Sequence, residues 1–229
     1  MTNADASQEH AAWREGRLRA VTAPTGNLAL IETRWGADDP AAALAGQPET
    51  VTATRLSRHD PLNGAVQHGV RLWDAASPAI RHFDGIDAFP YDPAWVLEAR
   101  YSEVSGERKV PFQHAQDAGF TRDLPVPGDL HLTLDGHDYT LSAFDDDGPL
   151  LLVFGDPTNR TETYGAGRFL FVERIPGTDR AVLDFNRAFV PPCGFSPHYN
   201  CPMPPPQNRL AVRVEAGEKL ALFRDGFDH

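Results

Sequence analysis

The sequence predicts a mostly β protein: an antiparallel sandwich or barrel-like domain that carries an N-terminal helix. Three observations support this fold class. Short apolar runs rich in β-branched and aromatic residues recur along the chain, Gly and Pro separate them, and a strong hairpin signal lies in the C-terminal half. We expect a single domain over residues 1–229, with a split near residue 110 as the alternative.

The N-terminal half begins with a predicted helix over residues 5–20, where Ala, Glu and Arg dominate and Trp13 and Leu18 form a narrow apolar stripe. NLALIETRW (27–35) is the first predicted strand, and a polar connection with a short helical turn follows it. The same features predict three further strands, VTATRLS (51–57), GVRLWDA (69–75) and VLEARYS (96–102).

The C-terminal half has the clearest strand signals. GDLHLTL-DG-HDYTLSAF (128–144) predicts a hairpin, because Asp135-Gly136 suits a type I′ turn between two alternating arms. PLLLVFGD (149–156) is a continuous apolar run, which indicates a strand buried on both faces. The remaining predicted strands are GRFLFVERI (167–175), RAVLDFNRAF (180–189), RLAVRVEAGE (209–218) and KLALF (219–223).

Charge and hydropathy restrict the partners. The formal net charge is −11, and no basic arm or cluster is present, so we expect neither nucleic acid nor a membrane surface as a partner. No apolar stretch suits a membrane span or a signal peptide, and this predicts a cytoplasmic protein. In that compartment, two cysteines favour thiols or ligands over a structural disulfide. The cofactor and the oligomeric state are left open.

The segment DFNRAFVPPCGFSPHYNCPMPPPQNRL (184–210) contains both cysteines and seven prolines. Cys193, His198 and Cys201 are spaced as C-x4-H-x2-C, and thiolates with an imidazole suit zinc, iron or copper. No fourth ligand is evident nearby, so these three are weak metal candidates. The alternatives are a thiol nucleophile or redox pair, and two small buried residues that fill gaps in a stiff loop.

Polar residues flank the cysteines. If AVLDFNRAF is a strand, Asp184 and Asn186 share one face, and Phe185 and Arg187 the other. Arg187 and Arg209, next to Asn208, could clamp a carboxylate or phosphate. Alternatively, they anchor the loop by bonding to its carbonyl groups.

Two other segments are candidates. GDPTNRTETYGAGRFL (155–170) carries Glu162, Tyr164 and Arg168 at a strand entrance, either as a turn with a salt bridge or as the polar rim of a cavity. It lacks the phosphate-binding GxxxxGK[ST] pattern, and the chain has no GxSxG or GxGxxG motif. The aromatic-rich segment 82–101 predicts either core packing or a wall that contacts a small organic ligand.

These segments resemble the bacterial family called domain of unknown function 1684. GDPTNRTETYGAGRFL, LDFNRAFVPPCGFSPHYNCPMPPPQNRL, EAGEK and FDGIDAFPYDPAW carry the resemblance, which covers about residues 80–220. Val190 stands where the family usually has asparagine, Thr158-Asn159-Arg160 replaces its usual T-S-G, and His198 lies at a variable position. The resemblance implies a β-rich domain and one shared pattern of residues: Glu162, Tyr164, Gly167, Arg168, Asp184, Asn186, Arg187, Cys193, Cys201, Asn208, Arg209, Glu215 and Glu218.

We therefore hypothesise a small-molecule enzyme whose cavity is walled by the 156–168 turn and the 184–209 segment. Cys193 or Cys201 is the expected nucleophile or ligand, with Asp184, Glu162 or Tyr164 for proton transfer or orientation. The expected substrate-binding residues are Arg168, Asn186, Arg187, Asn208 and Arg209. A non-catalytic ligand-binding or structural β module is the alternative.

Overall fold

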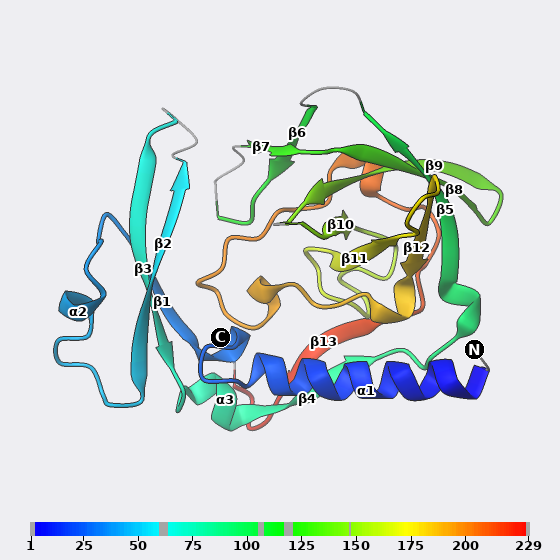
Figure 1. Ribbon diagram of the computed structural model, residues 1–229. Coiled ribbons are helices and arrows are strands. Elements are labelled where there is room, and N and C mark those ends of the chain that lie inside the picture. The colour runs from blue at the N-terminus through cyan, green and yellow to red at the C-terminus, as the bar shows by residue number, and fades with distance from the viewer. Residues whose placement is uncertain (1–2, 60–63, 105–107, 117–120, 147, 228–229) are drawn as a thin grey trace. The chain divides into compact units, whose positions relative to one another are not determined.

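The computed structural model describes residues 3–59, 64–104, 108–116, 121–146 and 148–227, which cluster into two compact units (Figure 1). The first unit takes in the chain up to Ala11, Asp87–Pro191 and Cys201–Leu220. The second takes in Ala12–Ile86, Pro192–Asn200 and the chain from Ala221 onward. The single-domain organisation stays a prediction.

The first unit is built on a closed barrel of six strands, in which every neighbouring pair is antiparallel. This confirms the mostly β fold class, in its barrel form. Around the barrel the strands are β10 (Leu150–Phe154), β11 (Arg168–Arg174), β12 (Arg180–Asp184), β5 (Val96–Glu103), β8 (Gly128–Leu134) and β9 (His137–Asp145) (Figure 1).

The strongest sequence signals of this unit are confirmed. All five residues of β10 are buried, as its unbroken apolar run predicts. Between β8 and β9, Asp135 and Gly136 have φ values of 49° and 75°, which is the backbone of a type I′ turn. Leu130, Leu141, Leu152 and Leu183 lie in the barrel core.

The predicted strand over 180–189 is wrong in its second half. β12 ends at Asp184, and Phe185–Arg187 forms a 3-10 turn, η3. The Asp184 carboxylate accepts a hydrogen bond from the backbone N–H of Asn186 at 3.1 Å, which caps the turn. The turn leaves Phe185 fully buried and Arg187 partly exposed, so the face assignment based on strand alternation does not apply beyond Asp184.

The predicted strand over 209–218 is also wrong. Only β13 (Glu218–Phe223) is a strand, and the chain between Leu210 and Gly217 is irregular. Its backbone carbonyl groups at Val214 and Ala216 accept hydrogen bonds from the Arg168 guanidinium rather than from a neighbouring strand. A buried side chain has thus satisfied polar groups that a sheet partner would otherwise satisfy.

The remaining helices and strands lie outside the six-stranded barrel. The N-terminal helix α1 (Asn3–Val21) confirms the predicted helix. The second unit contains a three-stranded antiparallel sheet with the order β1 (Leu30–Trp35), β3 (Val66–Asp74) and β2 (Val51–His59). Short helices α2 (Pro40–Ala43) and α3 (Pro78–His82) follow β1 and β3.

Three strands were not predicted, and they form two small sheets. β4 (Phe83–Ala88) pairs with β13, and β6 (Lys109–Gln113) pairs with β7 (Thr121–Pro125). The remaining 3-10 turns are η1 (Asn27–Ala29), η2 (Pro93–Trp95), η4 (Pro192–Gly194) and η5 (Pro206–Asn208). Within the described part of the chain, no helix has the length and hydropathy that a membrane crossing requires.

Candidate functional site

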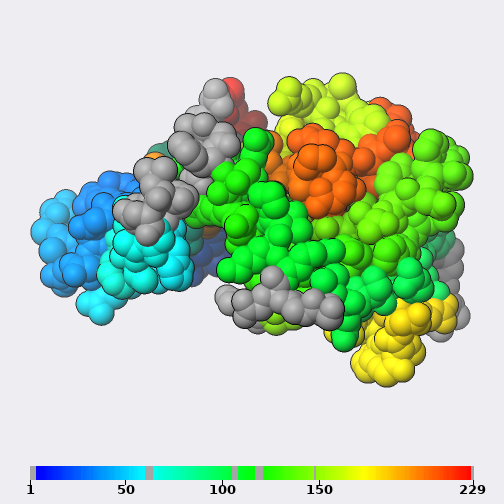
Figure 2. All heavy atoms as spheres, turned by 90° about the horizontal axis from the view of Figure 1, so that it is seen from above, coloured from blue at the N-terminus to red at the C-terminus, as the bar shows by residue number. Residues whose placement is uncertain are grey.

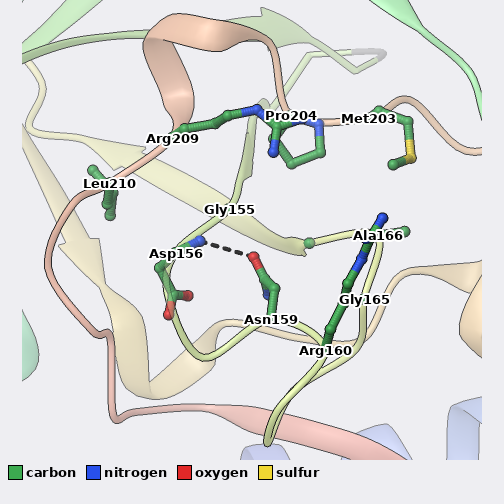
Figure 3. A pocket seen from close by; sticks show the side chains of 11 residues that line it. Gly155, Asp156, Asn159, Arg160, Gly165, Ala166, Met203, Pro204, Arg209 and Leu210 are labelled. Atoms are coloured by element: carbon green, nitrogen blue, oxygen red, sulfur yellow. Dashed lines mark hydrogen bonds between the residues drawn. The ribbon is translucent and has the colours of Figure 1, made fainter.

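The turn between β10 and β11 is held in shape by its own side chains. Asn159 Oδ1 accepts a hydrogen bond from the Asp156 N–H at 2.8 Å (Figure 3), and Asn159 Nδ2 donates to Thr163 Oγ1 at 2.9 Å. Thr158 and Thr163 are buried, and their hydroxyl oxygens lie 2.9 Å apart. These contacts fix the turn without help from a ligand.

Arg168, at the start of β11, connects this turn to the irregular segment 210–217. Its Nη2 donates to Asp156 Oδ2 at 2.7 Å and to the Val214 carbonyl at 2.8 Å, and Nη1 donates to the Ala216 carbonyl at 2.5 Å. Burial lowers the pKa of Arg168, and the Asp156 carboxylate acts in the opposite direction. Neither side chain has exposed surface, so Arg168 cannot touch a ligand in this conformation.

The Asn208-Arg209-Leu210 step alternates between the interior and the surface. Asn208 is fully buried, Leu210 is 4 % exposed, and Arg209 lies at the surface. Two backbone hydrogen bonds hold the step beside Gly155, from Gly155 N–H to the Asn208 carbonyl at 3.1 Å and from Leu210 N–H to the Gly155 carbonyl at 2.7 Å. The buried neighbours therefore direct the Arg209 side chain outward.

A pocket of about 380 Å³ lies between the turn and this step. Residues from 155–160, 165–167 and 203–210 line it (Figure 3), and in Figure 2 the yellow-green turn and the orange segment lie side by side on one face. Gly167 has a φ of 95°, and a Cβ there would lie 2.5 Å from Pro204 Cγ and 2.6 Å from the Phe154 carbonyl oxygen. Only glycine permits this approach of the two pocket walls.

Two arginines give the pocket its charge. Arg160 and Arg209 both line it, and their guanidinium groups have no hydrogen-bond or ion-pair partner among the residues that the structure describes. Asp156 also lines the pocket, but its negative charge is compensated by the buried ion pair with Arg168. The pocket is therefore positively charged in a chain whose formal net charge is −11.

Of the predicted substrate-binding residues, only Arg209 lines this pocket. The Asn186 side chain is fully buried and exchanges two hydrogen bonds with the Asp92 backbone, each 2.9 Å long. Arg187 lies 3.3 Å from Asp184, measured from Nε to Oδ2, and 3.9 Å from carboxylate oxygens of Glu9 and Glu173. These residues hold α1, η2 and η3 together at another part of the first unit.

The predicted proton-transfer groups have other partners. Glu162 forms an ion pair with Arg213 at the surface, and Arg213 also contacts Glu215 at 2.9 Å. The Tyr164 backbone donates to the Lys219 carbonyl at 2.9 Å. Neither Glu162 nor Tyr164 is among the residues that line the pocket.

The cysteine segment is divided between the units. Cys193 and His198 belong to the second unit, and Cys201 belongs to the first. Among the described residues, no group of three or more His, Cys, Asp or Glu side chains could hold a metal ion, so the weak metal candidates gain no support. Neither cysteine lines the Arg160–Arg209 pocket.

Thiol labelling tests the different environments of the cysteines. Cys193 is partly exposed and Cys201 is 6 % exposed, so an alkylating reagent should modify Cys193 first in the folded protein. Peptide mass mapping over time gives the two rates, and both thiols should react alike in denaturant. Equal rates in the folded protein would contradict this prediction.

The aromatic segment 82–101 packs against the fold. The Trp95 and Phe185 ring centroids lie 6.1 Å apart, and those of Tyr91 and His10 lie 5.2 Å apart. Phe89 lies under the Lys219 ammonium group at 4.6 Å. These contacts favour the packing interpretation over a ligand-contacting wall.

Arg160 was not predicted from the sequence as a site residue. It is exposed and has a φ of 68°, a left-handed conformation that is uncommon for residues other than glycine. The local signal was an arginine directly after Asn159 in a turn, which does not distinguish a ligand-binding group from a solvated one.

Comparisons with known proteins identify a family and solved structures that are similar to this chain. The model of the family "Protein of unknown function (DUF1684)" matches residues 81–219. The solution structure of an uncharacterized protein from gene locus rrnAC0354 of Haloarcula marismortui is similar at 31% sequence identity and a TM-score of 0.49, covering 60% of this chain and 77% of that one. A search of curated proteins found no match.

Proposed function

This chain belongs to the DUF1684 family. We propose that the pocket of this family member binds a small anionic ligand. One observation carries the proposal: Arg160 and Arg209 enter the same pocket from different chain segments, and no described carboxylate pairs with either. Guanidinium groups bind carboxylates and phosphates through two parallel hydrogen bonds, so two of them lining one pocket suit an anion.

The contacts within the pocket walls support binding by a rigid site. Asn159 fixes the turn before Arg160, and the backbone bonds of Gly155 fix the step that contains Arg209. Because the backbone of the walls is already held, binding mainly has to order the two arginine side chains. No cysteine or histidine is among the described residues that line the pocket, which favours binding over thiol chemistry.

Charge removal in the pocket should weaken anion binding without unfolding the protein. We expect Arg160→Gln and Arg209→Gln each to weaken binding of a small organic anion at least tenfold, since a charge-assisted hydrogen bond contributes about 1.5–3 kcal/mol. Both side chains are exposed, so the unfolding midpoint should stay close to that of the wild type. Calorimetric titration with phenyl phosphate and benzoate, beside urea unfolding, measures both quantities.

Arg100→Gln is the matched control. Arg100 is an exposed arginine on β5, outside the pocket, and its replacement changes the net charge equally. If Arg100→Gln weakens binding as much as the pocket variants, the effect comes from overall charge and the proposed site is wrong. Retention of wild-type affinity in the double variant Arg160→Gln/Arg209→Gln would also refute it.

A further inference from the structure

We infer that the ligand class is a phosphate monoester with a small organic group, an inference that rests on the proposed anion-binding function. The pocket's charge is the first reason. Arg160 and Arg209 contribute two positive charges, and the third charged lining residue, Asp156, is already paired with Arg168 at 2.7 Å. A ligand that balances this charge is a dianion, and a phosphate monoester carries a charge of about −1.5 to −2 near pH 7.

The arrangement of donors is the second reason. Arg209 enters from the 206–210 segment and Arg160 from the β10–β11 turn, on different sides of the pocket (Figure 3). The backbone N–H groups of Gly165 and Ala166, which also line it, donate no hydrogen bond within the described part of the chain. One planar carboxylate occupies one guanidinium, whereas the three oxygens of a phosphoryl group accept hydrogen bonds from several directions.

The remaining lining accounts for the organic group. Pockets for small organic ligands usually have volumes of about 300–1,000 Å³, and this one measures about 380 Å³. Met203, Pro204, Leu210 and Ala166 supply apolar surface beside the two arginines. The apolar surface would be left uncovered by inorganic phosphate, so an ester whose organic group covers it should bind more tightly.

Four probes on the full-length chain separate charge from shape. Phenyl phosphate is a tetrahedral dianion at pH 7.5, benzenesulfonate a tetrahedral monoanion, benzoate a planar monoanion and phthalate a dicarboxylate dianion. We expect calorimetric titration at pH 7.5 to show phenyl phosphate binding at least tenfold tighter than each of the others. Inorganic phosphate, titrated in the same way, should bind more weakly than phenyl phosphate does.

Lowering the pH gives an independent readout. The second pKa of a phosphate monoester is about 6, so at pH 5.0 only about a tenth of it is the dianion. Guanidinium groups do not deprotonate in proteins over this range, Asp156 is paired with Arg168, and no histidine is among the described lining residues. The affinity for phenyl phosphate should therefore fall about tenfold from pH 7.5 to 5.0, while that for benzenesulfonate stays constant.

The outcomes distinguish this inference from the proposed function. If phthalate or benzoate binds as tightly as phenyl phosphate, and Arg160→Gln and Arg209→Gln abolish that binding, the phosphate inference is overturned and the anion site stands. A pH-independent affinity for phenyl phosphate also overturns it. If none of the four probes binds, or binding is unaffected in both arginine variants, the inference and the proposed function both fail.

Discussion

Arg168→Leu is expected to lower the free energy of unfolding by about 3–5 kcal/mol, the usual cost of breaking a buried ion pair from one side. The substitution leaves the Asp156 carboxylate buried without its cation, and it leaves the carbonyl groups of Val214 and Ala216 without a donor. Urea unfolding followed by tryptophan fluorescence measures the change. The exposed Arg100→Leu should shift the midpoint little.

A double variant separates the buried charge from the lost carbonyl contacts. Asp156→Asn/Arg168→Leu removes both charges and keeps a side-chain oxygen for the Thr158 N–H, so it should be more stable than Arg168→Leu alone, even though the carbonyl groups of Val214 and Ala216 remain unsatisfied. If the free energy of unfolding of Arg168→Leu lies within about 1 kcal/mol of the wild-type value, the contacts of Arg168 with Asp156, Val214 and Ala216 do not stabilise the fold to the expected extent. If the single variant does not fold at all, the double variant carries the test.

Strand periodicity predicted most of the barrel. Segments with alternating or continuous apolar residues must bury those residues, and a strand of a sheet does so. The buried β10 and the β8–β9 hairpin are examples. The closure of these strands into a barrel was not predictable from the sequence, because it depends on contacts between residues that are far apart in the chain. Among the residues that the structure describes, β9 and β10 pair at two positions, Leu150 with Asp145 and Leu151 with Phe144. Beyond these, the Asn208 side chain connects the two strands.

The wrong prediction of a strand over 209–218 also arose because the sequence does not show contacts between residues that are far apart in the chain. Alternating Leu210, Val212 and Val214 resemble a strand, but the chain there is bonded by Arg168 from within the barrel rather than by a neighbouring strand. Local pattern cannot show which arginine will be buried. Arg168, Arg187 and Arg209 looked equivalent in sequence, and burial gives them three different environments.

The turn that contains Arg160 shows a further limit of the sequence. Arg160, the third residue of its T-N-R triplet, has a φ of 68°. That backbone region suits glycine, so an arginine there costs about 1–3 kcal/mol. Only the backbone geometry connects this residue with a pocket and with Arg209, which lies 49 positions further along the chain.

Asn208→Ala is the second large effect, with an expected loss of about 3–5 kcal/mol in the free energy of unfolding. Asn208 Oδ1 accepts from the Ser142 N–H at 2.9 Å, and Nδ2 donates to the carbonyls of Ser142 and Val153, each at 2.8 Å. Alanine leaves all three backbone groups buried without this partner. Each unsatisfied group costs about 1–3 kcal/mol, so the sum exceeds the effect of an ordinary surface substitution.

Two comparison variants make the Asn208 prediction specific. Gln207→Ala changes the exposed neighbour, whose contact to Ser142 Oγ is 3.3 Å, and should cost less than about 0.5 kcal/mol. Asn208→Asp keeps the shape but points a carboxylate oxygen at two carbonyl groups. Burial and these carbonyls raise the pKa of the new carboxyl group in the folded state. Asn208→Asp should therefore lose stability as the pH rises from the unfolded-state pKa to the raised folded-state pKa, and regain it below the unfolded-state pKa.

The same substitution should also weaken the anion site. Asn208 holds the backbone from which Arg209 extends, and Gly155 bonds to both sides of Arg209. Where Asn208→Ala still folds, its affinity for phenyl phosphate should therefore fall although Arg160 and Arg209 are unchanged, because a displaced guanidinium loses its bidentate geometry. Equal stability of the Asn208→Ala and Gln207→Ala variants, with wild-type affinity in both, would show that the barrel closes and the pocket is ordered without Asn208.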